Sequence, residues 1–148
     1  MAVFREPPYG NQHFLVDLGL GPGEESSFSE IIMPDIRIDA IEYRTGTDKE
    51  TGTRKIPGLA HYDNVTLRRG LTGSMTLYNW INDVRNGNVN ARRTVVISLQ
   101  SEDMTAIVFT WRLFRAWPVR YGFDNLNAKG TDVAIEELVL AYDRLEIE

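Results

Sequence analysis

The sequence predicts a mostly β fold, an antiparallel β-sandwich or barrel of about seven strands with one packed α-helix. Three observations lead to this prediction. Several segments of the 148-residue chain alternate apolar and polar side chains as strands do. Glycine and proline separate these segments, and only one stretch has a helical period. The length suggests a single domain that spans residues 1–148.

The composition and charge of the chain exclude several classes of function. The chain has no cysteine, which excludes thiolate chemistry and fits synthesis in a reducing cytoplasm. Its net charge of −5 argues against a general nucleic-acid binder. No apolar run approaches the roughly 20 residues that span a bilayer, and Met1–Gln12 lacks an apolar signal region, so we expect no membrane anchor. Both ends of the chain are acidic and residues 36–100 are basic, a layout that suits contacts between copies.

The N-terminal third is predicted to hold three strands. Gln12–Leu18 alternates, Phe28–Met33 is a short run, and Gly19–Gly23 is the loop between them. Ile36–Arg44 is the third strand, and its apolar positions change parity near Ala40. Because a slip of one residue moves side chains to the opposite face, we expect a bulge or bend there.

The middle of the chain contains an unusual polar segment, Thr45–Gly58. It is long for a connection in a compact domain, so we expect either a loop, functional or disordered, or a β-hairpin arm. Asn64–Arg69 then has the alternation of a short strand, which Gly70 and Gly73 end.

One helix is predicted, from Met75 to Asn86. Its apolar side chains form one stripe at helical spacing, at Leu77, Trp80, Ile81 and Val84. Ser74 is the expected N-terminal cap, and Asn86-Gly87 supplies the left-handed turn that commonly ends a helix. We expect the helix to cover one face or end of the sheet.

The C-terminal half is predicted to contain the longest strands. Arg92–Gln100 alternates regularly, and Ala106–Val119 alternates up to Pro118, which should end the strand or mark a sheet edge. Tyr121–Gly130 is expected to be a loop. Asp132–Ile147 forms either a strand pair or one bent strand, because its apolar parity changes along its length.

No catalytic, cofactor or metal site is predicted. His13 and His61 lie far apart and near no cysteine, so zinc has no ligand set. Glu136 and Glu137 are adjacent and should point to opposite faces of a strand, so they do not form a glycosidase pair. We expect both glutamates to lie at a bulge on the solvent-exposed surface. Gly19–Gly23 precedes no helical pattern and is a poor match to a dinucleotide-binding turn.

Four motifs resemble the tail-tube family of contractile phages, which bacterial extracellular contractile injection systems share. In chain order they are Tyr43-Arg44-Thr45-Gly46, Lys55-Ile56-Pro57-Gly58-Leu59, Asn64-Val65-Thr66-Leu67-Arg68-Arg69-Gly70 and Leu77-Tyr78-Asn79-Trp80-Ile81. Tyr9–Phe14 and Glu137–Asp143 fit the same pattern. Ile56 and Arg68 are mild departures, since the family usually has leucine and lysine there. The likeness covers nearly the whole chain.

The resemblance implies a structural subunit and not an enzyme. Members form six-fold rings whose sheets join into one barrel around a channel, and the rings stack into a tube inside a contractile sheath. It also implies sheath and baseplate partners, cargo or DNA in the channel, and assembly in the bacterial cytoplasm, with no cofactor. We expect the arm Thr45–Gly58 to reach a neighbouring subunit or ring. The predicted interface residues are Thr47, Asp48, Lys49, Glu50, Arg54, Lys55, Arg68 and Arg69, the last two facing acids of the next copy.

One alternative from a different class stays open, a monomeric β-sandwich binding module, for instance for carbohydrate. Exposed aromatic side chains would form its platform, and Trp111, Trp117 and Tyr121 are the candidates. Trp111 lies in the apolar register of its strand and is expected in the core, whereas Trp117 lies at a strand end. The sequence also does not separate a phage tail from an injection particle, or a main tube subunit from a tube-initiating relative.

Overall fold

The computed structural model describes residues 2–20, 25–26, 28–47, 49 and 51–148. Within these residues the strands are β1 (Phe14–Asp17), β2 (Glu25–Ser26), β3 (Glu30–Ile32), β4 (Ile36–Tyr43), β5 (Arg54–Tyr62), β6 (Val65–Gly70), β7 (Arg93–Gln100), β8 (Ile107–Phe123), β9 (Ile135–Ala141) and β10 (Arg144–Ile147). One α-helix, α1 (Thr76–Arg85), and a short 3-10 helix, η1 (Val89–Ala91), complete the described elements. The prediction of a mostly antiparallel β fold with one helix is confirmed, although the described strands number more than seven.

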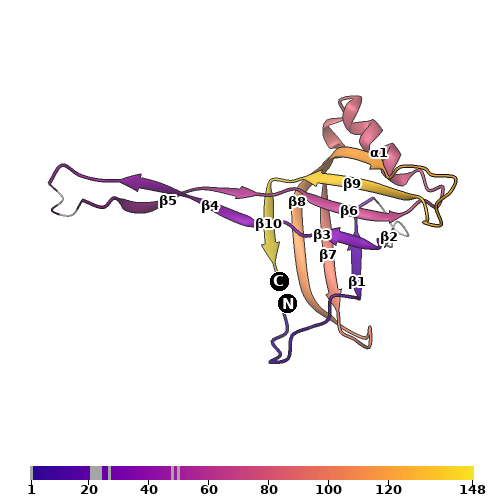
Figure 1. Ribbon diagram of the computed structural model, residues 1–148, viewed down its shortest axis with the longest axis horizontal. Helices are drawn as coiled ribbons and strands as arrows, with labels where there is room; N and C mark the ends of the chain where they lie inside the picture. The colour runs from indigo at the N-terminus through magenta and orange to yellow at the C-terminus, as the bar shows by residue number, and fades with distance from the viewer. Residues whose placement is uncertain (1, 21–24, 27, 48, 50) are drawn as a thin grey trace.

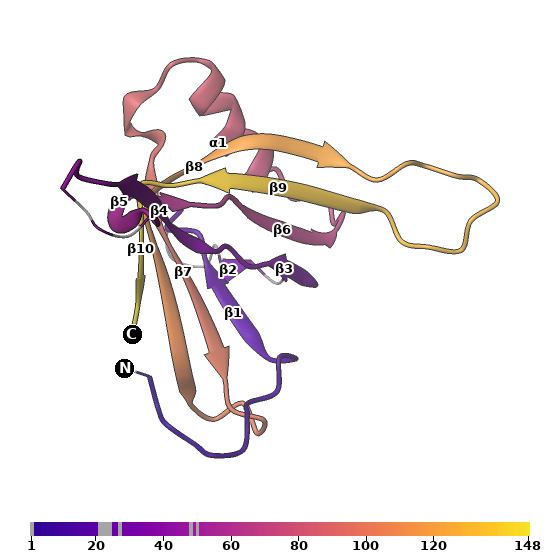
Figure 2. The ribbon, with the colours of Figure 1, turned by 60° about the vertical axis from the view of Figure 1, so that its left-hand side comes forward.

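Two sheets share the long strand β8. The first has the order β2-β1-β7-β8-β10, and the second has the order β8-β9-β6-β3. All of these pairings are antiparallel. Figures 1 and 2 show the first sheet descending toward the two chain ends, while β9, β6 and the second half of β8 run across it below α1. In a single chain the described strands do not close into a barrel, and the sheets are arranged as in a sandwich.

The strand β8 continues past the point where its end was predicted. It passes through Pro118 to Phe123, so the predicted loop at 121–130 begins later than expected. Arg115 has a φ of 56°, at the place where the register against β7 shifts, and the resulting bulge turns the strand from one sheet to the other. Pro118 is tolerated because, among the described residues, only β9 pairs with this half of β8, which leaves the other side as an edge.

The core lies between the two sheets and under α1. The side chains that meet there are Val16, Leu18, Val95, Ile97, Leu113 and Leu145 from the first sheet and its loops, Val65, Leu67, Leu138 and Leu140 from the second, and Leu77 and Trp80 from the helix. The strand alternation that predicted β6, β7 and β9 also determines which of their side chains are buried.

The helix α1 lies within one residue of its predicted bounds. Gly87 has a φ of 82° and provides the expected left-handed turn at its end. The expected cap is wrong: Met75 occupies the cap position without a side-chain bond, and the Ser74 hydroxyl is 3.4 Å from the Thr76 amide nitrogen, too far for a strong bond. No helix in the parts of the chain that the structure describes has the length and hydrophobicity needed to cross a bilayer.

The segment Asp132–Ile147 contains two strands, β9 and β10, which pair with different halves of β8 and not with each other. The change of apolar parity in the sequence does not correspond to a change of face within β9, since Glu136 points into the core on the same face as Leu138 and is only 1% exposed. A charged residue occupies this apolar position because Arg69 and Tyr121 supply hydrogen bonds to it. The expectation of a solvated bulge was wrong because an apolar/polar pattern assigns a glutamate to the surface, whether or not it has buried partners.

Candidate functional site

The strands β4 and β5 form a two-stranded hairpin, residues 36–62, which we call the arm. Figure 1 shows it projecting to the left, away from the rest of the fold. The β-hairpin alternative for Thr45–Gly58 is therefore correct, and the loop alternative is wrong for Lys55–Gly58, which belong to β5. Each residue of β4 is exposed, as is each residue of β5 except Gly58 and Tyr62.

The arm contains the irregularity predicted near Ala40. Ile38 pairs with Ala60 and Ala40 pairs with Pro57, so that Asp39 faces two residues of β5. Gly58 is one of these two, and a Cβ at that position would lie 2.9 Å from Cδ1 of Ile41. A larger residue at position 58 would therefore force the Ile41 side chain, which lies over the Gly58 backbone, to move.

The surface of the arm is unusually apolar for a segment exposed to solvent. Its exposed large apolar side chains are Ile36, Ile38, Ile41, Tyr43, Ile56 and Leu59. A two-stranded hairpin is marginally stable by itself, and both outer edges of this one lack a partner strand among the described residues. Both features are unusual for a segment that stays in contact with solvent.

The base of the arm is anchored to the fold by polar and aromatic contacts. Arg37 donates to Asp63 at 3.0 Å, and the Asp63 amide donates to the Asp35 carbonyl at 3.2 Å. The rings of Tyr62 and Tyr142 lie 5.9 Å apart. Burial, with smaller contributions from Asp63 and Tyr62, raises the pKa of Tyr142 to about 12. These contacts fix the direction in which the arm leaves the two sheets.

The predicted interface residues fall into two groups. Thr47 and Lys49 are exposed in the turn at the tip of the arm, and Arg54 and Lys55 begin β5, opposite Tyr43 and Glu42. Asp48 and Glu50 were predicted in the same group, but they lie outside the described residues. The arm thus brings the described members of this group together in its distal half.

Arg68 and Arg69, the second group, contact acids of their own chain. Arg68 donates to Glu137 at 2.6 Å and to Asp124 at 2.7 Å. Arg69 is buried and donates to Glu136, which also accepts a hydrogen bond of 2.6 Å from Tyr121. Burial and the hydrogen bond to Glu136 raise the pKa of Tyr121 to about 12. These pairs hold β6, β9 and β8 together, and a contact of either arginine with the next copy stays a prediction.

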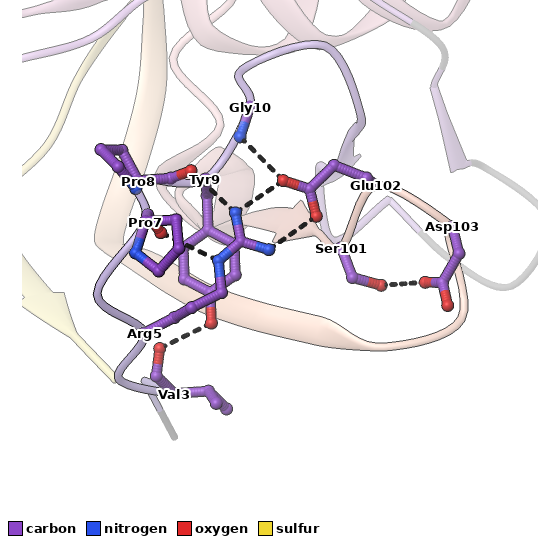
Figure 3. Close-up of polar contacts among 9 residues, drawn as sticks. All are labelled: Val3, Arg5, Pro7, Pro8, Tyr9, Gly10, Ser101, Glu102 and Asp103. Carbon is purple, nitrogen blue, oxygen red and sulfur yellow. Dashed lines mark hydrogen bonds and ion pairs between the residues drawn. The ribbon is translucent and has the colours of Figure 1, made fainter.

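A third feature, which we call the N-terminal strap, consists of residues 3–10 and crosses the turn between β7 and β8 (Figure 3). Arg5 donates to both oxygens of Glu102, at 2.9 and 2.7 Å, and its guanidinium lies 4.2 Å from the Tyr9 ring centre. The Val3 amide donates to the Val108 carbonyl, and the Tyr9 hydroxyl donates to the Val3 carbonyl at 2.8 Å. The strap is therefore an ordered part of the surface at this end of the first sheet.

Sequence reasoning missed the strap. Arg5 and Glu102 are 97 residues apart, and no local period or motif connects them. Only the fold brings the N-terminal segment beside the β7–β8 turn.

The aromatic residues proposed for a carbohydrate platform do not form one surface. Trp111 and Tyr121 pack against the core from different halves of β8, and Trp117 lies under the guanidinium of Arg92, 5.7 Å from ring centre to Cζ. In the described ranges, no three His, Cys, Asp or Glu side chains are grouped as metal ligands would be.

The chain matches the family described as T4-like virus tail tube protein gp19 over residues 10–146. It is similar to a chain of the extended sheath–tube complex of an extracellular contractile injection system, PVC, with 30% identity and a TM-score of 0.84 over 97% of this chain and 93% of that one. For the tube-terminating cap of the anti-feeding prophage, identity is 29% and the TM-score is 0.84, over 100% and 95% of the two chains. No curated protein sequence matches the chain significantly.

A more distant likeness concerns the fold alone. Hcp1 from Flavobacterium johnsoniae has 12% identity and a TM-score of 0.55, over 90% of this chain and 93% of that one. The family match, by contrast, extends over both sheets, α1 and the arm, and the structures of the injection systems share this arrangement from end to end. The chain belongs to the T4-like virus tail tube protein gp19 family, and its role is that of a structural component in the tube of a phage tail-like particle.

Proposed function

We propose that this chain is a subunit of the inner tube of a contractile tail or injection particle, whose copies form stacked six-fold rings around a central channel. The observation that carries the proposal is the arm. It exposes an apolar surface and two unpaired strand edges that the chain itself leaves uncovered among its described residues. In a tube, the arm of one copy packs against a neighbouring subunit or ring through its distal half, from Thr47 to Lys55.

The open margins of the first sheet support ring closure. Among the described residues, β10 pairs only with β8, and β2 pairs only with β1. Both outer margins thus present unpaired backbone N–H and C=O groups, which are satisfied when strands of adjacent copies join into one continuous sheet.

One face of the first sheet has the character of a channel lining. Asp17, Val96, Arg112 and Glu146 form a row across its strands, on the face opposite the core. Arg112 donates to Glu148 at 2.8 Å, and Arg144 donates to Glu146 at 2.9 Å, so that much of the charge on this face is compensated. A face that carries these polar side chains suits a water-filled channel through which cargo or DNA passes.

The partners follow from the same assembly. The similar structures contain a sheath and a sheath/tube terminator, and we infer sheath and baseplate proteins of the same particle as partners here. We assign the chain no catalytic role, and we place its synthesis and assembly in the bacterial cytoplasm, as one domain spanning residues 1–148.

The proposal is tested with the purified chain by size-exclusion chromatography and negative-stain electron microscopy. We expect rings or tubes from the unaltered chain. Deletion of residues 47–54 should prevent tube growth and leave the fold intact. The deletion connects Glu42 and Lys55, which are paired, through the four residues 43–46, a common hairpin length. A thermal melt reports whether the variant still folds.

A point variant tests the apolar surface of the arm independently of the turn at its tip. Leu59→Asp places a charge on an exposed apolar position of β5, so it should reduce assembly without changing the melting temperature. Tubes from both variants would contradict the role of the arm. An unaltered chain that stays monomeric at high concentration and binds glycans would support the binding-module alternative instead.

A further inference from the structure

The N-terminal strap presents an apolar side chain in an unusual way. Phe4 is 90% exposed, although the segment that carries it is held by the Arg5–Glu102 pair and by the backbone bond from Val3 to Val108. Val3, which precedes it in the chain, and Met104, in the β7–β8 turn, are also more than half exposed. Because the strap is already ordered, binding through Phe4 requires little further loss of conformational entropy, as in other preorganised binding segments.

A hollow that fits such a side chain lies at the other end of the first sheet. It has a volume of 370 Å³ and is lined by Val84, Gly87, Val89, Trp117, Arg92 and Arg115, among others. That volume is near the lower end of the roughly 300–1,000 Å³ typical of ligand pockets. Val89, one of the lining residues, is 86% exposed, and Trp117 contributes an aromatic side chain to the lining.

The strap and the hollow lie at opposite ends of β7. Arg93 pairs with Ala116 at the end beside the hollow, and Gln100 pairs with Ile107 at the end beside the strap. Eight residues of strand separate the two ends by roughly 25 Å, at about 3.3 Å per residue. One chain therefore cannot place its own Phe4 in its own hollow, and a second copy can.

The charges at the two ends are complementary. Near the strap, one basic side chain, Arg5, is accompanied by three acidic ones, Glu6, Glu102 and Asp103. Beside the hollow, Arg92 and Arg115 share a single carboxylate, that of Asp143, at 3.6 and 3.2 Å. Opposite fields of this kind orient two surfaces toward one another.

We propose that Phe4 of one copy docks into the hollow beside Trp117 of the next copy, joining successive rings head to tail. This inference rests on the tube proposed above and identifies one contact within it. The contact is heterologous, since two different surfaces meet, and it therefore repeats along an open filament. The strap end and the hollow end are the two ends of the repeating unit.

Cysteine cross-linking tests the contact directly, because the natural chain contains no cysteine. The double variant Phe4→Cys/Val89→Cys is assembled, oxidised and run on a denaturing gel without reductant. We expect a ladder of covalent multimers that disappears on reduction. The matched control is Phe4→Cys/Leu126→Cys, because Leu126 is 85% exposed on the β8–β9 connection, away from both ends of the sheet. The single variants report pairing between identical positions and should give dimers at most.

A second measurement uses no cysteine. Phe4→Ala should raise the concentration at which assembly begins by at least about tenfold, as loss of a central interface aromatic does. Leu126→Ala should leave it unchanged. Glu6→Lys and Arg92→Glu should each weaken assembly, and the double reversal should restore part of it.

Electron microscopy of the same samples separates the two proposals. The Phe4 contact is overturned if tubes form without a ladder above that of the control, or if tubes form equally well with Phe4→Ala. Either outcome still supports the proposal that the chain forms a tube. A ladder without rings or tubes supports the contact and overturns the tube. Neither tubes nor a ladder overturns both.

Discussion

Glu136 and Arg69 place two charges in the region between the sheets, where a lone charge is costly. Arg69 donates to one carboxylate oxygen of Glu136 and Tyr121 donates to the other, so the carboxylate retains hydrogen bonds that it would have in water. The three residues come from β6, β9 and β8, and their contact therefore specifies how these strands are arranged.

We predict that Glu136→Gln destabilises the fold by about 3–5 kcal/mol, because Arg69 would keep a buried charge without its partner. Urea denaturation measures the change. The matched control is Glu146→Gln, whose ion pair with Arg144 is exposed and should be worth less than about 1 kcal/mol. Equal losses in the two variants would contradict the importance of the buried pair.

The stability of the N-terminal strap should decrease at low pH. Hydrogen bonds from Arg5 lower the pKa of Glu102 from 4.5 to about 2. Because the folded pKa lies below the unfolded one, the stabilisation is complete above about pH 4.5 and is lost as the pH falls through about 2. We expect hydrogen exchange at the Val3 and Gly10 amides to accelerate across this range, relative to amides of β6. In Glu102→Gln the acceleration should be absent, and its persistence would assign the effect to another group.

The helix is held to the fold by a hydrogen bond as well as by its apolar stripe. Trp80 Nε1 donates to the Ala91 carbonyl of η1 at 2.7 Å in the core. Trp80→Phe removes this donor and should cost about 1–3 kcal/mol by leaving the carbonyl unpaired. Tyr78→Phe on the exposed face of α1, which removes a bond from Arg85, should stay within about 0.5 kcal/mol. Thermal or urea unfolding of both variants distinguishes packing alone from the hydrogen bond.

The elements with regular side-chain periods were the ones that the sequence predicted well. The helix and β7 end within a residue or so of their expected bounds, because burial on one face repeats along each of them. The second half of β8 was missed, and β5 was foreseen only as one of two alternatives, because Pro118 and Pro57 suggest an end to a strand. Neither proline interrupts pairing here, since each lies where one side of the strand has no described partner.

The features of the candidate site likewise fall into those that local sequence predicted and those that it did not. The arm was found from its composition and length, which are local properties. The strap, the hollow and the buried place of Glu136 depend on side chains that are far apart in sequence and meet only in the fold. A local sequence pattern contains no information about contacts between residues that are far apart in the chain.

For the whole molecule, the arm should be the first site of attack when the chain is unassembled. Lys49 and Lys55 are exposed on a hairpin that little else covers. We predict that trypsin first cuts within residues 44–55 of free subunits, and that assembly slows this cleavage strongly. Lys129, exposed on the β8–β9 connection, provides the internal reference on mass-spectrometric maps. Equal protection of both sites, or of neither, would contradict burial of the arm between copies.

The long strand β8 gives the molecule a mechanical property. Its 17 residues continue through both sheets as one strand that turns near Arg115, with a contour length of about 55 Å at roughly 3.3 Å per residue. A pull applied between the two ends of β8 is consequently borne by covalent bonds along one backbone. The two sheets cannot slide past each other without distorting that backbone, so the subunit should keep them in a fixed relation when it is loaded.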